Sequence, residues 1–107
     1  MQKTANYIET NYEMNDGAEH YEPYPPYYWD RYDYTEETEV LTLVDHVIVS
    51  AVDVPFSGHE TYIFQCDETG VVLDWSEMPG SFRGALDHER ALNGLGYTSK
   101  IMKAIGA

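Results

Sequence analysis

Three prolines within four residues constrain how the first third of this chain can fold. Pro23, Pro25 and Pro26 each fix their own φ and push the preceding residue towards extended geometry. The sequence therefore predicts that residues 19–37 are extended and not helical. The same segment reads EHYEPYPPYYWDRYDYTEE, so it consists almost entirely of aromatic rings and carboxylates.

This composition favours a surface that binds a basic partner. Rings provide contact area at a low cost in side-chain entropy, and acids provide a negative field that attracts cations. The sequence predicts a partner-binding surface made of Tyr24, Tyr27, Tyr28, Trp29, Asp30, Tyr32, Asp33, Glu36 and Glu37.

Two other uses of the rings stay open. They can cover the open face of a sheet and complete a core that is too small by itself. In an extended strand, successive side chains point to opposite sides. Tyr28, Asp30, Tyr32 and Tyr34 would then face one way and Trp29, Arg31 and Asp33 the other, so that one face covers the core and the other stays available to a partner.

Length and charge narrow the class of protein. The chain has 107 residues, enough for one domain, with 43% hydrophobic residues and a net charge of −13. Residues 1–45 hold 11 acids and 2 bases. Nucleic acids and anionic membranes are polyanions and would repel such a chain, so we expect neither to be bound directly. The acids favour a basic protein partner, or else serve only as a solvated surface.

The number of cysteines and the hydropathy of the sequence indicate the cellular compartment of the protein. Cys66 is the only cysteine, so no internal disulfide can form, which fits a reducing compartment. The first residues lack the apolar stretch of a secretory signal, and no apolar run approaches the ~20 residues of a membrane helix. We expect a soluble protein of the cytoplasm, the host cytoplasm if a phage encodes it.

The remainder of the chain predicts strands followed by helix. Residues 39–44 and 47–52 are rich in β-branched side chains, and one long bent strand is favoured over a hairpin at the polar step between them. Residues 60–66 and 71–75 should pair across a turn at 67–70. We expect Ile63 or Phe64, Val72, Trp75 and Leu92 to lie in the core. Asp87 is a good N-cap for a helix that Gly94 or Gly96 ends, and Thr98 or Ser99 could cap a last short helix.

The resulting fold class is α+β. We expect an antiparallel meander of three or four strands, one or two short C-terminal helices, and an extended acidic, tyrosine-rich N-terminal arm. The arm would span residues 1–37 and the small α+β domain residues 38–107. Residues 1–18 fit neither helical nor strand periodicity well, and are expected to be irregular, with at most one helical turn or an edge strand.

No pattern in the sequence indicates catalysis, a cofactor or a metal. The histidines and Cys66 show none of the short spacings typical of metal sites. His59 and Cys66 lie at opposite ends of one predicted strand, roughly 20 Å apart. Cys66 itself is expected to be a small buried hydrophobe. We therefore expect no catalytic residue, no cofactor and no metal ligand, and the protein is not expected to be an enzyme.

Parts of residues 60–97 resemble short open reading frames of bacteriophage genomes. The similarity is carried by Glu60-Thr61-Tyr62-Ile63-Phe64, by Asp67 to Gly70, by Asp74-Trp75-Ser76-Glu77, by Leu86-Asp87-His88-Glu89 and by Gly96-Tyr97. The size and charge are similar to those of phage inhibitors of host defence, including DNA mimics and small anti-CRISPR proteins. That class has no shared motif, so it implies no site residues.

These observations lead to one functional hypothesis and two alternatives. The hypothesis is a small acidic inhibitor that occludes a basic, nucleic-acid-handling host protein. The first alternative is a structural or assembly module that docks through its aromatic arm. The second is an enzyme or small-ligand binder of unrecognised type.

Overall fold

The protein folds mostly into strands, with one short helix among the described residues. The computed structural model describes residues 3–12, 17–56 and 58–100. In chain order the elements are β1 (Thr4–Asn11), β2 (Ala18–Tyr24), β3 (Tyr27–Asp33), β4 (Thr38–Val44), β5 (Val47–Val54), β6 (Gly58–Cys66), β7 (Val72–Asp74), β8 (Phe82–Arg83), α1 (His88–Leu95) and β9 (Thr98–Lys100).

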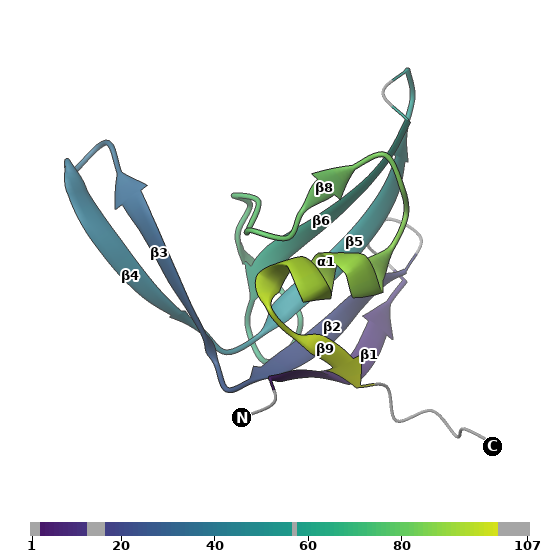
Figure 1. The fold of residues 1–107 in the computed structure, drawn as a ribbon, viewed down its shortest axis with the longest axis horizontal. Coiled ribbons are helices and arrows are strands. Elements are labelled where there is room, and N and C mark those ends of the chain that lie inside the picture. The colour runs from purple at the N-terminus through teal and green to yellow at the C-terminus, as the bar shows by residue number, and fades with distance from the viewer. Residues whose placement is uncertain (1–2, 13–16, 57, 101–107) are drawn as a thin grey trace.

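Two sheets organise these strands. The larger sheet has the order β7-β6-β5-β2-β1-β9. β8 also belongs to this sheet and pairs with β6, which β7 pairs with as well. Its described pairs are antiparallel except for β1 and β9, which run parallel. Of the strands in the described ranges, the second sheet contains only β3 and β4. In Figure 1 the ribbon of this β3–β4 hairpin leaves the larger sheet at its base and diverges from it towards its tip.

The main core lies between the larger sheet and α1. Val47, Val49 and Ile63 point from the central strands towards Leu92 and Leu95 of the helix, and all five are buried. The opposite face of the sheet holds a smaller cluster of Ala18, Ile48, Phe64 and Cys66. Burial raises the pKa of the Cys66 thiol to about 12, so this cysteine is a buried apolar side chain, as predicted.

Local sequence signals determine both ends of α1. The Asp87 carboxylate accepts a hydrogen bond from the Arg90 backbone N–H at 3.0 Å, which is the N-cap predicted from the sequence. Gly96 ends the helix with φ of 106°, a left-handed conformation that favours glycine. The predicted start and end of this helix are confirmed.

The turn between β6 and β7 is also confirmed. One Asp67 carboxylate oxygen accepts hydrogen bonds from the backbone N–H groups of Thr69 (2.8 Å) and Val71 (3.0 Å) and from the Thr69 hydroxyl. These bonds lower the pKa of Asp67. Gly70 takes φ of 88°, as expected for a turn glycine.

Several expectations about topology are wrong. The described residues form nine strands in mixed sheets, more than three or four. β5, β6 and β7 are consecutive antiparallel neighbours, as a meander requires, but the other neighbour of β5 is β2 and not β4. Residues 4–11 are a paired strand, not irregular chain. The boundary at residue 38 falls between two paired strands of one hairpin. Thr98 and Ser99 lie in β9, and residues 101–107 are outside the described part.

The polar step at 45–46 separates two strands that do not pair with each other. β4 pairs with β3, whereas β5 pairs with β2 and β6, so the chain crosses here from the small sheet to the large one. This excludes the tight hairpin. It also corrects the favoured picture of one long bent strand, because the two halves belong to different sheets.

The residues expected in the core differ in how far they are buried. Ile63, Phe64 and Leu92 are buried, and Val72 is partly buried against the smaller cluster. Trp75 is 66% exposed, so its predicted burial is wrong. The reason is that β7 is a short edge strand that ends at Asp74, so Trp75 lies past the end of the sheet's outermost strand, with its ring centre 5.1 Å from that of Phe64. Within the described ranges, no helix has the length and apolarity needed to cross a bilayer.

Candidate protein-binding surface

The β3–β4 hairpin has two chemically different faces. In its register Tyr28 lies opposite Leu43, Asp30 opposite Leu41, and Tyr32 opposite Glu39. These six side chains form the outer face, because alternate residues of a strand point to the same side. The predicted split between Tyr28, Asp30 and Tyr32 on one side and Trp29, Arg31 and Asp33 on the other agrees with this register.

The inner face attaches the hairpin to the rest of the protein. Trp29 is 6% exposed and belongs to the main core. The Arg31 guanidinium lies 3.9 Å from the centre of the Trp29 ring and donates a hydrogen bond to Asp74 of β7 at 2.7 Å. Backbone N–H donation from Ser76, together with Arg31, lowers the pKa of Asp74 and keeps it ionised. Trp29 thus serves the fold.

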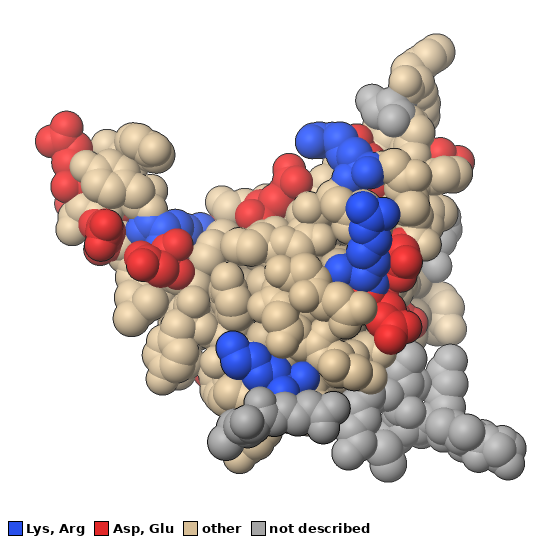
Figure 2. All heavy atoms as spheres, viewed as in Figure 1, with Lys and Arg blue, Asp and Glu red and all other residues tan. Residues whose placement is uncertain are grey.

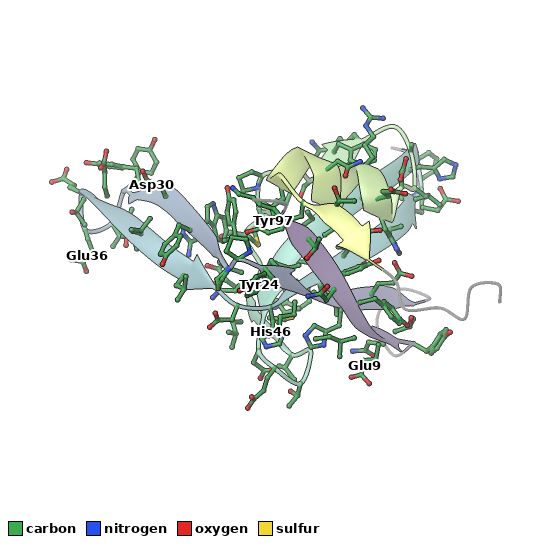
Figure 3. All side chains as sticks on the ribbon, turned by 60° about the horizontal axis from the view of Figure 1, so that its bottom comes forward. Glu9, Tyr24, Asp30, Glu36, His46 and Tyr97 are labelled. Atoms are coloured by element: carbon green, nitrogen blue, oxygen red, sulfur yellow. The ribbon has the colours of Figure 1, made fainter. Side chains whose placement is uncertain are left out.

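Contacts at the hairpin's base hold the proline-rich turn. The Tyr97 hydroxyl donates a hydrogen bond to the Pro25 carbonyl at 2.6 Å, and its ring meets Tyr27 edge to face. Burial raises the pKa of Tyr97. The hairpin therefore leaves the main sheet at a fixed point, and Figure 3 shows Tyr24 and Tyr97 near this base and Asp30 and Glu36 towards its far end.

The outer face combines exposed apolar side chains with acids. Tyr28 is 62% exposed, Leu41 64% and Leu43 46%. Asp30 and Glu39 on the same face are also exposed. Isolated exposed leucines are common, but two leucines and two tyrosines on one small sheet face form a patch of the kind found at binding sites.

The tip of the hairpin adds charge to this patch. The Asp33 carboxylate accepts hydrogen bonds from the backbone N–H groups of Thr35 (2.8 Å) and Glu36 (3.2 Å), so it is used to shape the turn. The side chains of Glu36 and Glu37 are exposed. Figure 2 shows carboxylates gathered at the hairpin, whereas much of the positive charge in that view lies over β8 and α1.

An acidic cavity of about 390 Å³ lies where the hairpin meets the β6–β7 turn. Leu43 and Leu73 give it apolar walls, and Gln65, Cys66 and His46 complete the lining. Its four carboxylates come from three different places in the sequence: Glu22, Asp45, and the adjacent pair Asp67 and Glu68. Among the described residues, no three His, Cys, Asp or Glu side chains are placed so that they could hold one metal ion, so we assign no metal to it.

A pair of histidines lies beside this cavity. His20 is fully buried, and its Nε2 lies 2.9 Å from Nδ1 of His46, so an N–H of one ring donates a hydrogen bond to a nitrogen of the other. Burial, and then the nearby His46, lowers the pKa of His20 below its ordinary value of 6.5, although the acids Glu9, Asp67 and Glu22 oppose this shift. His20 is therefore neutral in the folded protein near neutral pH.

The predicted site residues fall into two groups. Tyr28, Asp30, Tyr32, Glu36 and Glu37 are exposed on the hairpin, and Tyr24 is exposed at the end of β2. Trp29 is buried, and Tyr27 and Asp33 are partly buried on the inner face. The structure thus brings only part of the predicted set to one accessible surface.

Sequence reasoning missed the contribution of β4. Glu39, Leu41 and Leu43 share the outer face with the tyrosines, because β4 pairs with β3. In the sequence, residues 40–44 are almost uniformly apolar, so nothing there marks Leu41 and Leu43 as the exposed ones. Their exposure depends on which strand pairs with β4.

A second polar cluster holds α1 against β2. One oxygen of the Glu19 carboxylate accepts a hydrogen bond from the Tyr21 hydroxyl at 2.7 Å and also contacts Nδ1 of His88. Burial, followed by the hydrogen bond to Glu19, raises the pKa of Tyr21. This cluster links the first turn of the helix to the sheet.

Comparison with known proteins gave no match: no protein-family model, no curated protein and no solved structure is significantly similar to this chain.

Proposed function

We propose that this protein binds a basic, nucleic-acid-handling host protein and occludes the surface that normally holds phosphates. The observation that carries the proposal is the outer face of the hairpin, which places exposed Tyr28, Leu41 and Leu43 beside Asp30 and Glu39. Exposed ion pairs contribute only ~0–1 kcal/mol each, so the apolar side chains supply most of the affinity. The acids chiefly accelerate association and set its salt dependence.

A capture experiment followed by competition tests this proposal. A photo-crosslinking residue replaces Tyr28, and the protein that it captures is purified and loaded with a fluorescent DNA or RNA. Adding the acidic protein should release the labelled nucleic acid. The matched control places the crosslinker at Phe56, which is fully exposed in the β5–β6 turn, far from the hairpin in Figure 1. Capture from both positions alike, or no release, contradicts the proposal.

Binding kinetics separate the two components of the surface. Neutralising Asp30, Glu36 and Glu37 should slow association and flatten its dependence on salt, because steering acts at long range and is screened. Replacing Tyr28 by alanine should speed dissociation with little change in the salt slope, because the ring acts after contact.

An assembly module is the second candidate. It is favoured by the way the hairpin projects from the main sheet, which suits insertion into a neighbouring subunit (Figure 1). A captured partner that stays bound to its nucleic acid in the competition experiment would support this role over occlusion.

A further inference from the structure

We infer that the outer face of the hairpin and the acidic cavity form one docking groove for a segment of a basic partner that carries apolar side chains next to an arginine or lysine. The inference rests on the proposed function and adds the chemistry of the occupant. Apolar side chains of the segment lie on the hairpin, and its cationic side chain enters the cavity.

Leu43 makes the two parts continuous. It pairs with Tyr28 on the outer face of the hairpin, and it also lines the cavity. Asp45, two residues further along the chain, lines the cavity as well. An occupant that covers Leu43 therefore reaches both the exposed rings and the carboxylates without leaving the protein surface.

The charge of the cavity selects the occupant. Of the described residues that line it, four are carboxylates, and none is lysine or arginine. Leu43 and Leu73 can pack against the aliphatic stem of an arginine or lysine while the carboxylates hold its charged end. A nucleic acid or an acidic segment would be repelled. A second copy of this chain would bring another net charge of −13, which opposes self-association through this groove.

A small peptide tests the groove directly. The probe is a blocked tetrapeptide of three leucines and a C-terminal arginine, titrated into isotope-labelled protein and followed by amide chemical shifts. We expect saturable shifts at Leu43, Gln65 and Cys66. Replacing the arginine by neutral citrulline should weaken binding about tenfold, because a charge-assisted hydrogen bond is lost. The absence of saturable shifts there, or equal binding of both peptides, overturns the inference.

Matched variants locate the binding. The double variant Asp45→Asn with Glu68→Gln should weaken binding of the arginine peptide about three- to tenfold. The control double variant Glu77→Gln with Glu89→Gln removes the same charge elsewhere on the protein and should have little effect on this binding. Asp67 is left intact because it shapes its turn. Equal loss in both double variants would mean non-specific attraction and would refute the groove.

The apolar half has its own matched pair. Leu43 is 46% exposed and Leu86 is 48% exposed, so Leu43→Ser and Leu86→Ser remove similar surface from different places. Of the two variants, only Leu43→Ser should weaken binding of the peptide. Sedimentation of the free protein adds a further check: a dimer that Leu43→Ser dissociates would show that a second copy is the occupant, against the inference.

The failure of this inference can be told apart from the failure of the proposed function. If the acidic protein releases nucleic acid from the captured partner and the Leu43→Ser variant binds that partner as well as the wild type does, the proposed occlusion stands and the inferred groove is wrong. If the arginine peptide binds the groove while the partner keeps its nucleic acid, the groove stands and the occlusion is wrong.

Discussion

Trp29 and Tyr28 are neighbours in the chain that point to opposite faces of the hairpin, and their truncation should have very different effects on stability. Trp29 is 6% exposed in the main core, and Tyr28 is 62% exposed on the outer face. A buried tryptophan removes about 150–250 Å² from water, which at about 25 cal/mol per Å² is worth about 4–6 kcal/mol. Because alanine keeps part of that surface, we expect Trp29→Ala to lower the free energy of unfolding by about 3–5 kcal/mol.

For Tyr28→Ala the expected loss is less than about 1 kcal/mol. The side chain is mostly exposed, and the substitution removes its cross-strand pair with Leu43; such pairs contribute roughly 0.2–1 kcal/mol. Urea denaturation of both variants, followed by circular dichroism and fitted with a common slope, measures the two values. A loss below about 1 kcal/mol for Trp29→Ala would refute its place in the core. A larger loss for Tyr28→Ala than for Trp29→Ala would refute the assignment of the two faces.

Three further predictions concern the core, a glycine and a histidine. Leu92→Ala should cost about 2–5 kcal/mol in urea denaturation, because the side chain is fully buried between helix and sheet; a loss under half a kcal/mol would contradict that packing. Gly80→Ala should lower the melting temperature far more than Gly58→Ala. Both glycines have positive φ, but a Cβ at Gly80 would lie 2.4 Å from the Ala91 carbonyl oxygen, whereas a Cβ at Gly58 meets nothing within 4 Å. The pKa of His20 is lower in the folded than in the unfolded protein, so the unfolded chain binds more protons below about pH 6.5. The contribution of His20 to stability is therefore complete above that pH, and it declines as the pH falls towards the folded pKa. Unfolding free energies at about pH 7.5 and about pH 5 should show this loss in the wild type and less of it in His20→Gln, and equal slopes for the two proteins would contradict it.

Features that depend on a few neighbouring residues could be predicted from the sequence. The Asp67–Gly70 turn and the Asp87 cap each arise from hydrogen bonds between residues at most four positions apart. The prolines act on their own φ and on the preceding residue, so they favour extended geometry at residues 22–26, where β2 ends, and do not act on β3 at residues 27–33.

The pairing of distant strands could not be predicted in the same way. β1 has the sequence TANYIETN, in which Ala5 is the only buried side chain, so its local preference for a strand is weak. It becomes a strand because β2 and β9 supply backbone partners on both sides. The acidic cavity is equally non-local, because Glu22, Leu43 and Leu73 come from different parts of the chain. Rings and acids indicated a binding surface, but only the register shows which of them are accessible.

The parallel pair of β1 and β9 has a consequence for how the molecule is made. Thr4 lies opposite Thr98, so nearly the whole described chain separates two strands that touch. During synthesis β1 emerges before β9, and its edge at Thr4–Asn6 lacks this partner until β9 leaves the ribosome. We therefore expect folding to finish only after translation of β9, at the slow rates of about milliseconds to seconds typical of non-local β topologies. In that interval, the exposed edge of β1 is the place where chaperones or other nascent chains can bind.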